Sequence, residues 1–330
     1  MTKTTIYYLL FLFLIPTLFY LHINCGEFDI DITKFFLGEL SENELVILYD
    51  LRITRALKAI FIGGSLAIAG ALLQGVFKNP LASPGIVGTS SGAMLGAILI
   101  MFIGCTQTYF ISLGAFIGSA IATLLVYALS YSYSSRKSDL TTMILIGVAI
   151  SALCASASSL ILSFSLEDWE VGKRMVLWGF GDLGNTQDYE IYILLRVFVI
   201  GLIFAIFQIK NLNLMSLGQD TAQSLGVSVE LSKFFIIIIS SMLAGTAVAF
   251  GGMIGFIGLI CPHMVRLLFG NNYKHIIPFS CLAGATLLLL VDFLVKYIKL
   301  QQEYDLKIGI ITSFIGVPFF ITLIIKRKLK

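Results

Sequence analysis

The chain has 330 residues, of which 58% are hydrophobic and only 12% charged, and its formal net charge is +3. Ordinary soluble proteins carry roughly 25% charged residues, so a soluble domain of this size could not cover its surface with so few charges. The composition therefore excludes most soluble proteins and indicates a chain whose surface faces lipid. No nucleic-acid partner is expected.

Apolar stretches long enough to cross a bilayer recur along the chain. A spanning helix needs about 20 apolar residues, and continuously apolar runs indicate helices rather than the alternating strands of a barrel. Two shorter stretches, 90–104 and 253–269, bring the predicted total to about ten transmembrane helices. The expected fold is an all-α integral membrane protein with a single transmembrane domain over 1–330. The longer predicted spans are 6–23, 56–77, 109–131, 141–164, 190–209, 233–250, 276–298 and 308–326.

The charges between these spans predict an orientation. Ten spans place both termini on one side of the membrane, and that side carries many lysines and arginines in short loops. Its acidic residues are only Asp139, Asp220 and Glu230. Because basic short loops remain in the cytoplasm, we expect both termini to be cytoplasmic in a multi-pass protein of the inner (cytoplasmic) membrane.

Two arginines end the segment that joins the first two spans, in Arg52-Ile53-Thr54-Arg55. Such residues can anchor a helix end by extending their charged heads to the membrane surface. They can also form a docking point for an acidic partner, because a guanidinium presents a rigid fork to carboxylates. The sequence leaves both interpretations open.

An irregular membrane turn is predicted after the second span. Backbone of this kind persists at membrane depth only where protein or a water-filled cavity satisfies its polar groups, and broken helices often line the route in transporters. The turn is expected at Asn79, Pro80, Leu81, Ala82, Pro84 and Gly85.

The stretch that follows, Gly88–Gly92, matches the G-x-S-x-G motif of serine hydrolases. That motif needs a strand–turn–helix setting, whereas here it opens a membrane helix. An intramembrane protease with Ser90 as nucleophile is therefore a minor alternative.

The span 141–164 carries several small residues, namely Ala152, Ala155, Ser156, Ala157, Ser158 and Ser159. A small, weakly polar surface suits either close helix packing or the wall of a passage for a bulky ligand. The sequence does not separate these two interpretations.

The longest cytoplasmic connection, 210–232, is amphipathic and contains glycines on both sides of a short predicted helix, 220–225. It lacks the face rich in Lys and Arg that is typical of helices lying on a membrane, so a protein partner is expected there. Near the outer end of the span 276–298, Asp292 and Lys296 are four residues apart and are expected to pair.

The chain contains no Walker sequence and no other phosphate-binding loop. It is therefore not expected to be an enzyme, to have catalytic residues, or to bind a cofactor. Its five cysteines are scattered without a metal-binding pattern. If transport is driven by ATP, the ATP binds to a separate partner subunit.

Taken together, several segments make the chain resemble the FecCD-type permeases, which include the cobalamin, haem and ferric-siderophore ABC importers. The resemblance runs in family order from about residue 50 to 320. The matching stretches are Arg52–Arg55, Gln74–Gly92, Leu217–Val227, Gly255–His263, Gly284-Ala285 with Asp292, and Ile308–Phe319.

This resemblance implies a type II ABC importer permease that pairs with a second copy or a paralogue. Two ATP-binding subunits and a periplasmic or lipid-anchored substrate-binding protein are the other implied partners. The resemblance also implies that the translocation pathway is lined by Ser156, Ser159 and Thr312. Arg52, Arg55 and Lys296, the last in place of a frequent family arginine, would contact carboxylates of the binding protein. The residues implied to couple to the ATPase are Leu217, Gly218, Gln219, Asp220, Ala222, Leu225, Gly226 and Val227.

The predicted function is the import of an iron chelate, either a ferric siderophore or ferric citrate. A haem or cobalamin importer permease is the alternative. A secondary transporter coupled to ions is disfavoured, because such proteins place ionisable groups near the bilayer midplane, whereas Lys58, Arg196 and Asp292 lie near the ends of their predicted spans.

Overall fold

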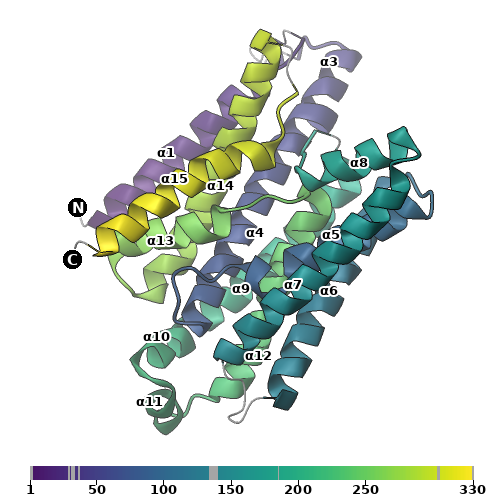
Figure 1. Cartoon of the computed structure of the whole chain (residues 1–330). Helices are drawn as coiled ribbons and strands as arrows, with labels where there is room; N and C mark the ends of the chain where they lie inside the picture. The colour runs from purple at the N-terminus through teal and green to yellow at the C-terminus, as the bar shows by residue number, and fades with distance from the viewer. Residues whose placement is uncertain are drawn as a thin grey trace.

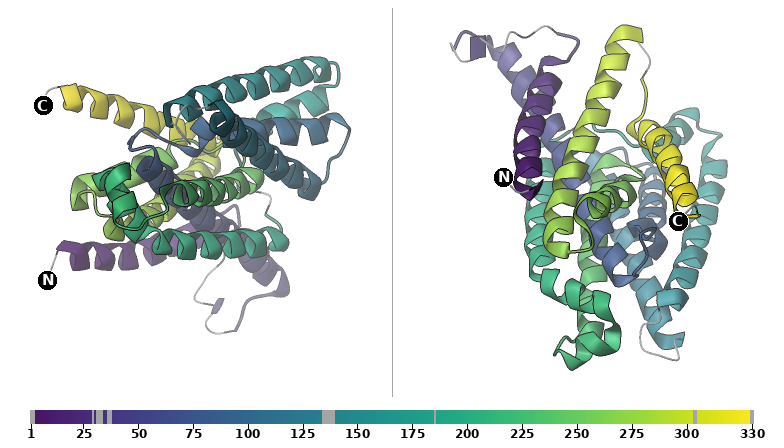
Figure 2. Two further views of the ribbon diagram at one scale, coloured as in Figure 1. Left: turned by 90° about the horizontal axis from the view of Figure 1, so that it is seen from below. Right: turned by 90° about the vertical axis from the view of Figure 1, so that its left-hand side faces the viewer.

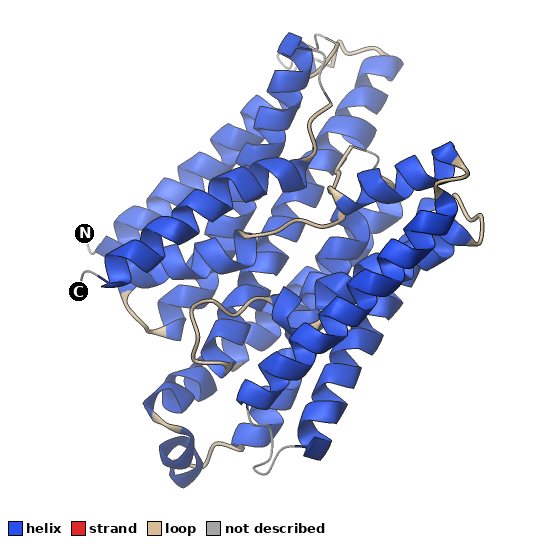
Figure 3. Cartoon of the chain, in the orientation of Figure 1, coloured by secondary structure: helices blue, strands red, loops and turns tan. Residues whose placement is uncertain are grey.

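The computed structural model describes residues 3–28, 30, 34–35, 38–133, 140–184, 186–302 and 305–328. Every regular element within these residues is a helix, which confirms the predicted all-α fold (Figure 3). The elements in chain order are α1 (Lys3–Asn24), α3 (Glu42–Val46), the π-helical η1 (Ile47–Ile53), α4 (Thr54–Val76), the 3₁₀-helical η2 (Pro84–Val87), α5 (Thr89–Phe102), α6 (Thr108–Tyr133), α7 (Leu140–Ser165), α8 (Trp169–Gly179), α9 (Asp188–Phe207), α10 (Ile209–Leu217), α11 (Gln219–Ser224), α12 (Val229–Gly251), α13 (Ile257–Phe269), α14 (Tyr273–Gln302) and α15 (Ile308–Lys328).

Seven helical segments of the described chain are long and apolar enough to cross a membrane. Three shorter apolar helices, α5, α13 and the first part of α15, complete the set of predicted stretches. The count of ten spans depends on these three short helices and stays a prediction. In Figure 1 the described chain begins and ends on the same side, on the left, whereas α3 lies at the opposite end of the bundle.

The second long helix begins earlier than the sequence predicted. The segment 24–55 was expected as a connection, but α3, η1 and α4 run as one helical segment from Glu42 to Val76. The cause is a capping box: the backbone N–H of Ser41 donates to Glu44 Oε2 at 2.8 Å, and the Ser41 hydroxyl accepts from the Glu44 backbone. Because this exchange satisfies backbone groups at the helix start, the helix already forms within the connection between the first two predicted spans.

Helix α4 lies at the centre of the fold and packs against α9, α12, α13 and α14, as the two views of Figure 2 show. Its glycines permit the close contacts. A Cβ atom at Gly63 would lie 2.2 Å from the Gly284 oxygen, and one at Gly70 would lie 1.9 Å from the Gly258 oxygen. Small residues at such positions let helix backbones approach closely in a membrane.

Helices α5, α6 and α7 form a second group, on the right in Figure 1. The α5–α6 contact also depends on glycine, because a Cβ at Gly96 would lie 2.0 Å from the Gly114 oxygen. Helix α7 contacts this group along one face only, and just 17% of its most apolar window is buried. Most of α7 therefore faces outward in a single copy of the chain.

The predicted irregular turn lies between α4 and α5. Asn79 Oδ1 accepts a hydrogen bond from the Leu81 backbone at 2.9 Å, and Pro84 begins the short helix η2. The turn packs against α7, where a Cβ at Gly147 would lie 1.9 Å from the Ile86 oxygen. Protein contacts of this kind explain how irregular backbone is tolerated here.

Candidate transport and partner-binding sites

Arg52 is only 4% exposed and is directed toward the segment that follows α1. Its Nη1 donates to the Ile23 carbonyl at 2.8 Å, and its Nη2 donates to the Phe28 carbonyl. The last carbonyls of a helix have no partner within the helix, and cations bind favourably at that end. Arg52 therefore caps α1 and holds the residues after it.

Arg55 pairs with Asp292 of α14, whose side chain is fully buried. Arg55 Nε lies 2.9 Å from Asp292 Oδ2, and Arg55 Nη2 lies 2.7 Å from Oδ1. His22 Nε2 of α1 approaches the same carboxylate at 2.7 Å from Oδ2. This cluster joins α1, α4 and α14 at the end of the bundle where α3 lies.

The expected pairing of Asp292 with Lys296 was wrong. Lys296 Nζ instead donates to the backbone carbonyl of His22 at 2.9 Å. The reason is geometric, because the guanidinium of Arg55 offers two parallel donors to the carboxylate and an ammonium cannot. The sequence could not show that Arg55, 237 residues away, reaches the same place.

The three predicted docking residues surround one cavity at this end of the bundle. Its volume is about 220 Å³, and it lies between the end of α1, η1 and the end of α14. Lys299 adds a fourth cation and pairs with Glu27 at 3.0 Å. The structure therefore brings Arg52, Arg55 and Lys296 together, although all three already bind groups of the chain.

A second buried ion pair, which the sequence did not reveal, joins α4 to α9. Lys58 Nζ lies 2.6 Å from Glu190 Oε2, and both side chains are almost fully buried. A lysine within an apolar span indicates a buried acidic partner, because a charged residue is costly there without one. The partner lies 132 residues further along the chain, and no local pattern identifies it.

The connection between α8 and α9 is fastened to the start of α15. Lys307 Nζ lies 2.6 Å from Asp182 Oδ2, and the Gly309 N–H donates to the Phe180 carbonyl at 2.9 Å. Burial alone would raise the pKa of Asp182, but the hydrogen bonds from Lys307 and from the Gly184 N–H hold this pKa below its usual value. These contacts position the beginning of α15.

At the opposite end of the bundle, α10 and α11 form the predicted coupling segment (Figure 1). Helix α11, Gln219–Ser224, nearly coincides with the predicted helix 220–225. Gly218 and Gly226, at its two ends, have φ angles of +141° and +85°, which favour glycine. Met215, Ala222, Val227 and Val229 form one buried hydrophobic cluster within this segment.

The coupling segment has an exposed apolar surface and an internal tether. Leu217 and Leu225 are 68% and 58% exposed, whereas the buried Lys233 of α12 donates to Gln219 Oε1 at 3.2 Å and to Glu230 Oε1 at 3.0 Å. The tether fixes the start of α11 to α12. The exposed leucines next to it suit contact with a protein partner.

The predicted pathway residues do not share one surface. Ser156 and Ser159 are exposed on α7, but Thr312 is buried and its hydroxyl donates to the Gly309 carbonyl at 3.1 Å. Next to the buried Thr312, the residues of α15 that face away from the rest of the chain are Ser313 and Phe314.

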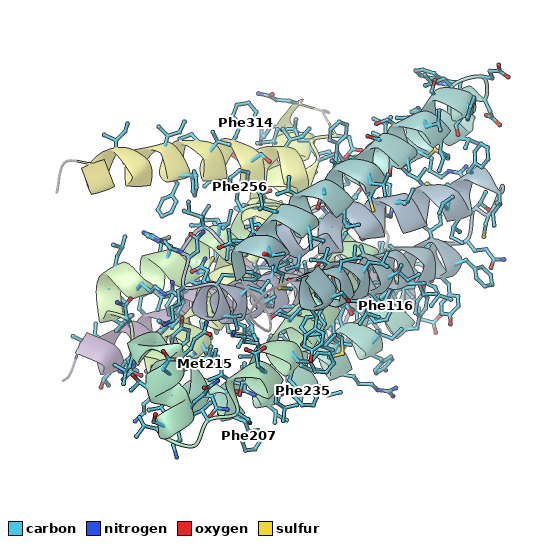
Figure 4. The ribbon with its side chains drawn as sticks, turned by 60° about the horizontal axis from the view of Figure 1, so that its bottom comes forward. Phe116, Phe207, Met215, Phe235, Phe256 and Phe314 are labelled. Carbon is cyan, nitrogen blue, oxygen red and sulfur yellow. The ribbon has the colours of Figure 1, made fainter. Side chains whose placement is uncertain are left out.

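These two residues line a groove of about 450 Å³ between α5, α8 and α15. Figure 4 shows Phe314 on the outer side of α15 and Phe256 on its inner side. Ser90 also lines the groove, but no described residue forms a strand, so the setting that a hydrolase serine needs is missing from the described chain.

Long apolar helices, joined by irregular connections and carrying charged clusters at their ends, are typical of a multi-pass membrane protein. Residues 10–326 match the family model described as the FecCD transport family. The chain belongs to the FecCD transport family, as the sequence resemblance predicted.

Several curated relatives cover most of the chain. The hemin transport system permease protein HmuU of Yersinia pestis is 35% identical over 84% of this chain and 83% of its own length. The Fe(3+)-citrate import system permease protein YfmD of Bacillus subtilis is 34% identical, over 94% of this chain and 92% of that protein. The vitamin B12 import system permease protein BtuC of Serratia proteamaculans is 35% identical, over 86% and 83%.

The fold is also similar to a solved structure of a metal-chelate type ABC transporter in an inward-facing conformation. That structure aligns with a TM-score of 0.85 and 28% sequence identity, covering 96% of this chain and 97% of its own.

Proposed function

We propose that this chain is the permease subunit of an ABC importer that carries an iron chelate, a ferric siderophore or ferric citrate, into the cytoplasm. The observation that carries this proposal is the family match over residues 10–326. Relatives that cover most of the chain are named for hemin, Fe(3+)-citrate and vitamin B12 transport. Haem or cobalamin is therefore the alternative cargo.

The coupling segment is where separate ATP-binding subunits would bind. Its exposed Leu217 and Leu225 provide an apolar contact, and its tether through Lys233 provides a rigid link to α12. Closure of the ATPase pair would move α11, and α12 would carry that movement into the membrane. If the ATP-binding subunits bind the coupling segment, that end of the bundle faces the cytoplasm, and both termini would be cytoplasmic.

A second copy of the permease, or a paralogue, would complete the translocation pathway. The exposed small residues of α7, among them Ser156 and Ser159, would form one wall, and the groove beside Ser313 and Phe314 would form the adjoining one. The small and weakly polar side chains of α7 would let a bulky chelate pass without binding it tightly.

A substrate-binding protein would deliver the chelate to the outer cavity. Four cations line or adjoin this cavity, and Glu27 is the acidic residue among its lining residues. Acidic side chains of the binding protein complement this charge, and such complementarity governs orientation and association rate.

Uptake into reconstituted vesicles tests the proposal. The permease is incorporated with its ATPase subunit and its binding protein, and labelled ferric citrate, haem and cobalamin are offered separately. We expect uptake of the iron chelate only when ATP is present on the ATPase side. Uptake driven by a proton or sodium gradient without the ATPase would instead support a secondary transporter.

A further inference from the structure

Tyr273, the first residue of α14, is buried where α14 meets α4 and α13. A Cβ atom at Gly75, in the last turn of α4, would lie 2.7 Å from the Tyr273 hydroxyl oxygen. Arg266 of α13 donates to this oxygen from Nη2 at 2.9 Å, and its guanidinium carbon lies 5.6 Å from the centre of the tyrosine ring. That separation is within the range of a cation–π contact. One side chain therefore joins the ends of three helices.

Helix α10 of the coupling segment binds the same point through Asn213. The Tyr273 backbone N–H donates to Asn213 Oδ1 at 3.0 Å, and Asn213 Nδ2 donates to Asn272 Oδ1 at 3.1 Å. Backbone donors in the first turn of a helix have no partner within that helix, so Asn213 caps α14 from a different helix. Asn213, Asn272, Tyr273 and Arg266 are here called the α10–α14 junction.

The α10–α14 junction is separate from the link between the coupling segment and α12. That link contains the tether from Lys233 to Gln219. It also contains a hydrogen bond from Asn211 Nδ2 of α10 to Ser232 Oγ of α12 at 3.3 Å. Two nearby asparagines of α10 therefore bond to two different long helices, Asn211 to α12 and Asn213 to α14.

Helix α14 is joined to its neighbours far beyond its first turn. It extends from Tyr273 to Gln302 and packs along α4. Toward its other end, Asp292 binds Arg55 of α4 and His22 of α1. Because closely packed interiors transmit displacement rather than absorb it, a displacement of the first turn of α14 would be shared by α1 and α4.

We propose that Asn213 is a positioning residue for transport, which makes α10 and the first turn of α14 move as one body. The movement of the coupling segment then enters α4, α13 and α14 as well as α12. The inference rests on the proposed ATP-driven import and adds a second link to it. Helices α12 and α14 both pack on α4, so two links displace the central helix together with its neighbours.

Replacing Asn213 by leucine tests this link with a side chain of similar size. Asn213→Leu removes both hydrogen bonds, and we expect ATP-driven uptake into the reconstituted vesicles to fall about tenfold, since two hydrogen bonds contribute roughly that factor. ATP hydrolysis should stay near its native rate, whereas a loss of folded protein would lower both. Asn271→Leu, at an exposed position in the adjoining connection, is the matched control and should transport normally. Native uptake by Asn213→Leu would overturn the proposal.

A covalent bridge tests whether the two helices move as one body. Cys25 and Cys105, the cysteines that are not buried, are replaced by serine, and Asn213→Cys is combined with Asn272→Cys. Uptake should be low before bridging, because the hydrogen bonds are lost. A short bifunctional methanethiosulfonate should then restore most of it. Bridged protein that stays inactive would mean that the helices move relative to each other, and thiols that do not cross-link would contradict the contact itself.

These outcomes are distinguishable from a failure of the proposed function. If the native protein with its ATPase and binding protein takes up no chelate in the presence of ATP, the proposed function fails. If native uptake is present and the Asn213→Leu variant matches the Asn271→Leu control, the proposed function stands and the link through the α10–α14 junction is wrong.

Discussion

At the scale of single residues, the end of the bundle that carries α3 is organised by buried charges that bind one another. Asp292 is fully buried and receives Arg55 and His22, and Glu190 receives Lys58. A buried charge without its partner is far more costly than the complete pair is stabilising. Each pair therefore fixes which helices can be neighbours.

Removing Arg55 alone should destabilise the protein strongly. We expect Arg55→Met to lower the free energy of unfolding by about 3 kcal/mol, because Asp292 would remain charged and buried. The double variant Arg55→Met/Asp292→Leu removes both charges and should recover most of this loss. Thermal unfolding in detergent, followed by tryptophan fluorescence, measures both; a double variant less stable than the single one would contradict the argument.

The Asp182–Lys307 pair should make the attachment of α15 depend on pH. The pKa of Asp182 lies below its usual value, so its stabilisation is present above about pH 4 and is lost as the pH falls through the lowered pKa. Although burial alone would lower it, the pKa of Lys307 is raised by its hydrogen bonds with Asp182 and Asp305. Its contribution is therefore present below about pH 10 and is lost as the pH rises through the raised pKa.

Hydrogen exchange at the Gly309 amide, which donates to the Phe180 carbonyl, measures this attachment. We expect protection to fall below about pH 4 by no more than about 1 kcal/mol, because Asp182 is partly exposed and solvent screens the pair. Lys307→Met should abolish the acid-dependent step. A step that persists in this variant would assign it to another group.

At the scale of elements, the sequence predicted those features that local patterns determine. The two glycines around α11 and the polar residues between them located the coupling helix. The Ser41–Glu44 capping box is also present in the sequence. The apolar run alone, however, predicted that the helix begins near Arg55. Helix α8 was missed because it is too short and too polar for a membrane span, although Asp168 caps its first turn.

Contacts between elements could not be predicted in the same way. The partner of Lys58 lies on α9, and the carbonyls that bind Arg52 and Lys296 lie at the end of α1. Periodicity describes the face of one helix and says nothing about which distant helix covers it. The outer cavity was therefore predicted as separate cations and not as one site.

The tether of α11 should be necessary for coupling rather than for folding. Lys233 is buried and holds Gln219 of α11 next to Glu230 of α12. We expect Lys233→Met to reduce ATP-driven uptake about tenfold, since it removes hydrogen bonds to a charged group, while the ATPase still associates. Lys274→Met, at an exposed position at the start of α14 and outside the coupling segment, is the matched control and should transport normally. Normal uptake by the Lys233 variant would show that the tether does not transmit the movement.

At the scale of the whole molecule, the single copy has one densely packed centre and several sparsely covered helices. Helix α4 is enclosed by its neighbours, whereas α7 and α15 contact the rest of the chain mainly along one side. Figure 1 shows both helices on the face toward the viewer. Small residues on α7 are unusual choices for a surface that only meets lipid, because larger apolar side chains bury more area there.

This arrangement predicts that α7 faces a passage and not lipid at Ser156. Ser156→Trp should then lower uptake of a bulky chelate at least about tenfold without lowering the amount of folded protein, because the indole narrows the passage between two copies. Ile203→Trp, at an exposed position on α9, places the same side chain against lipid and should transport normally. Both variants are compared for uptake and for ATP hydrolysis in the same vesicles. Equal uptake by the two variants would mean that Ser156 faces lipid as Ile203 does, and the pathway would then have to lie on another surface of the fold.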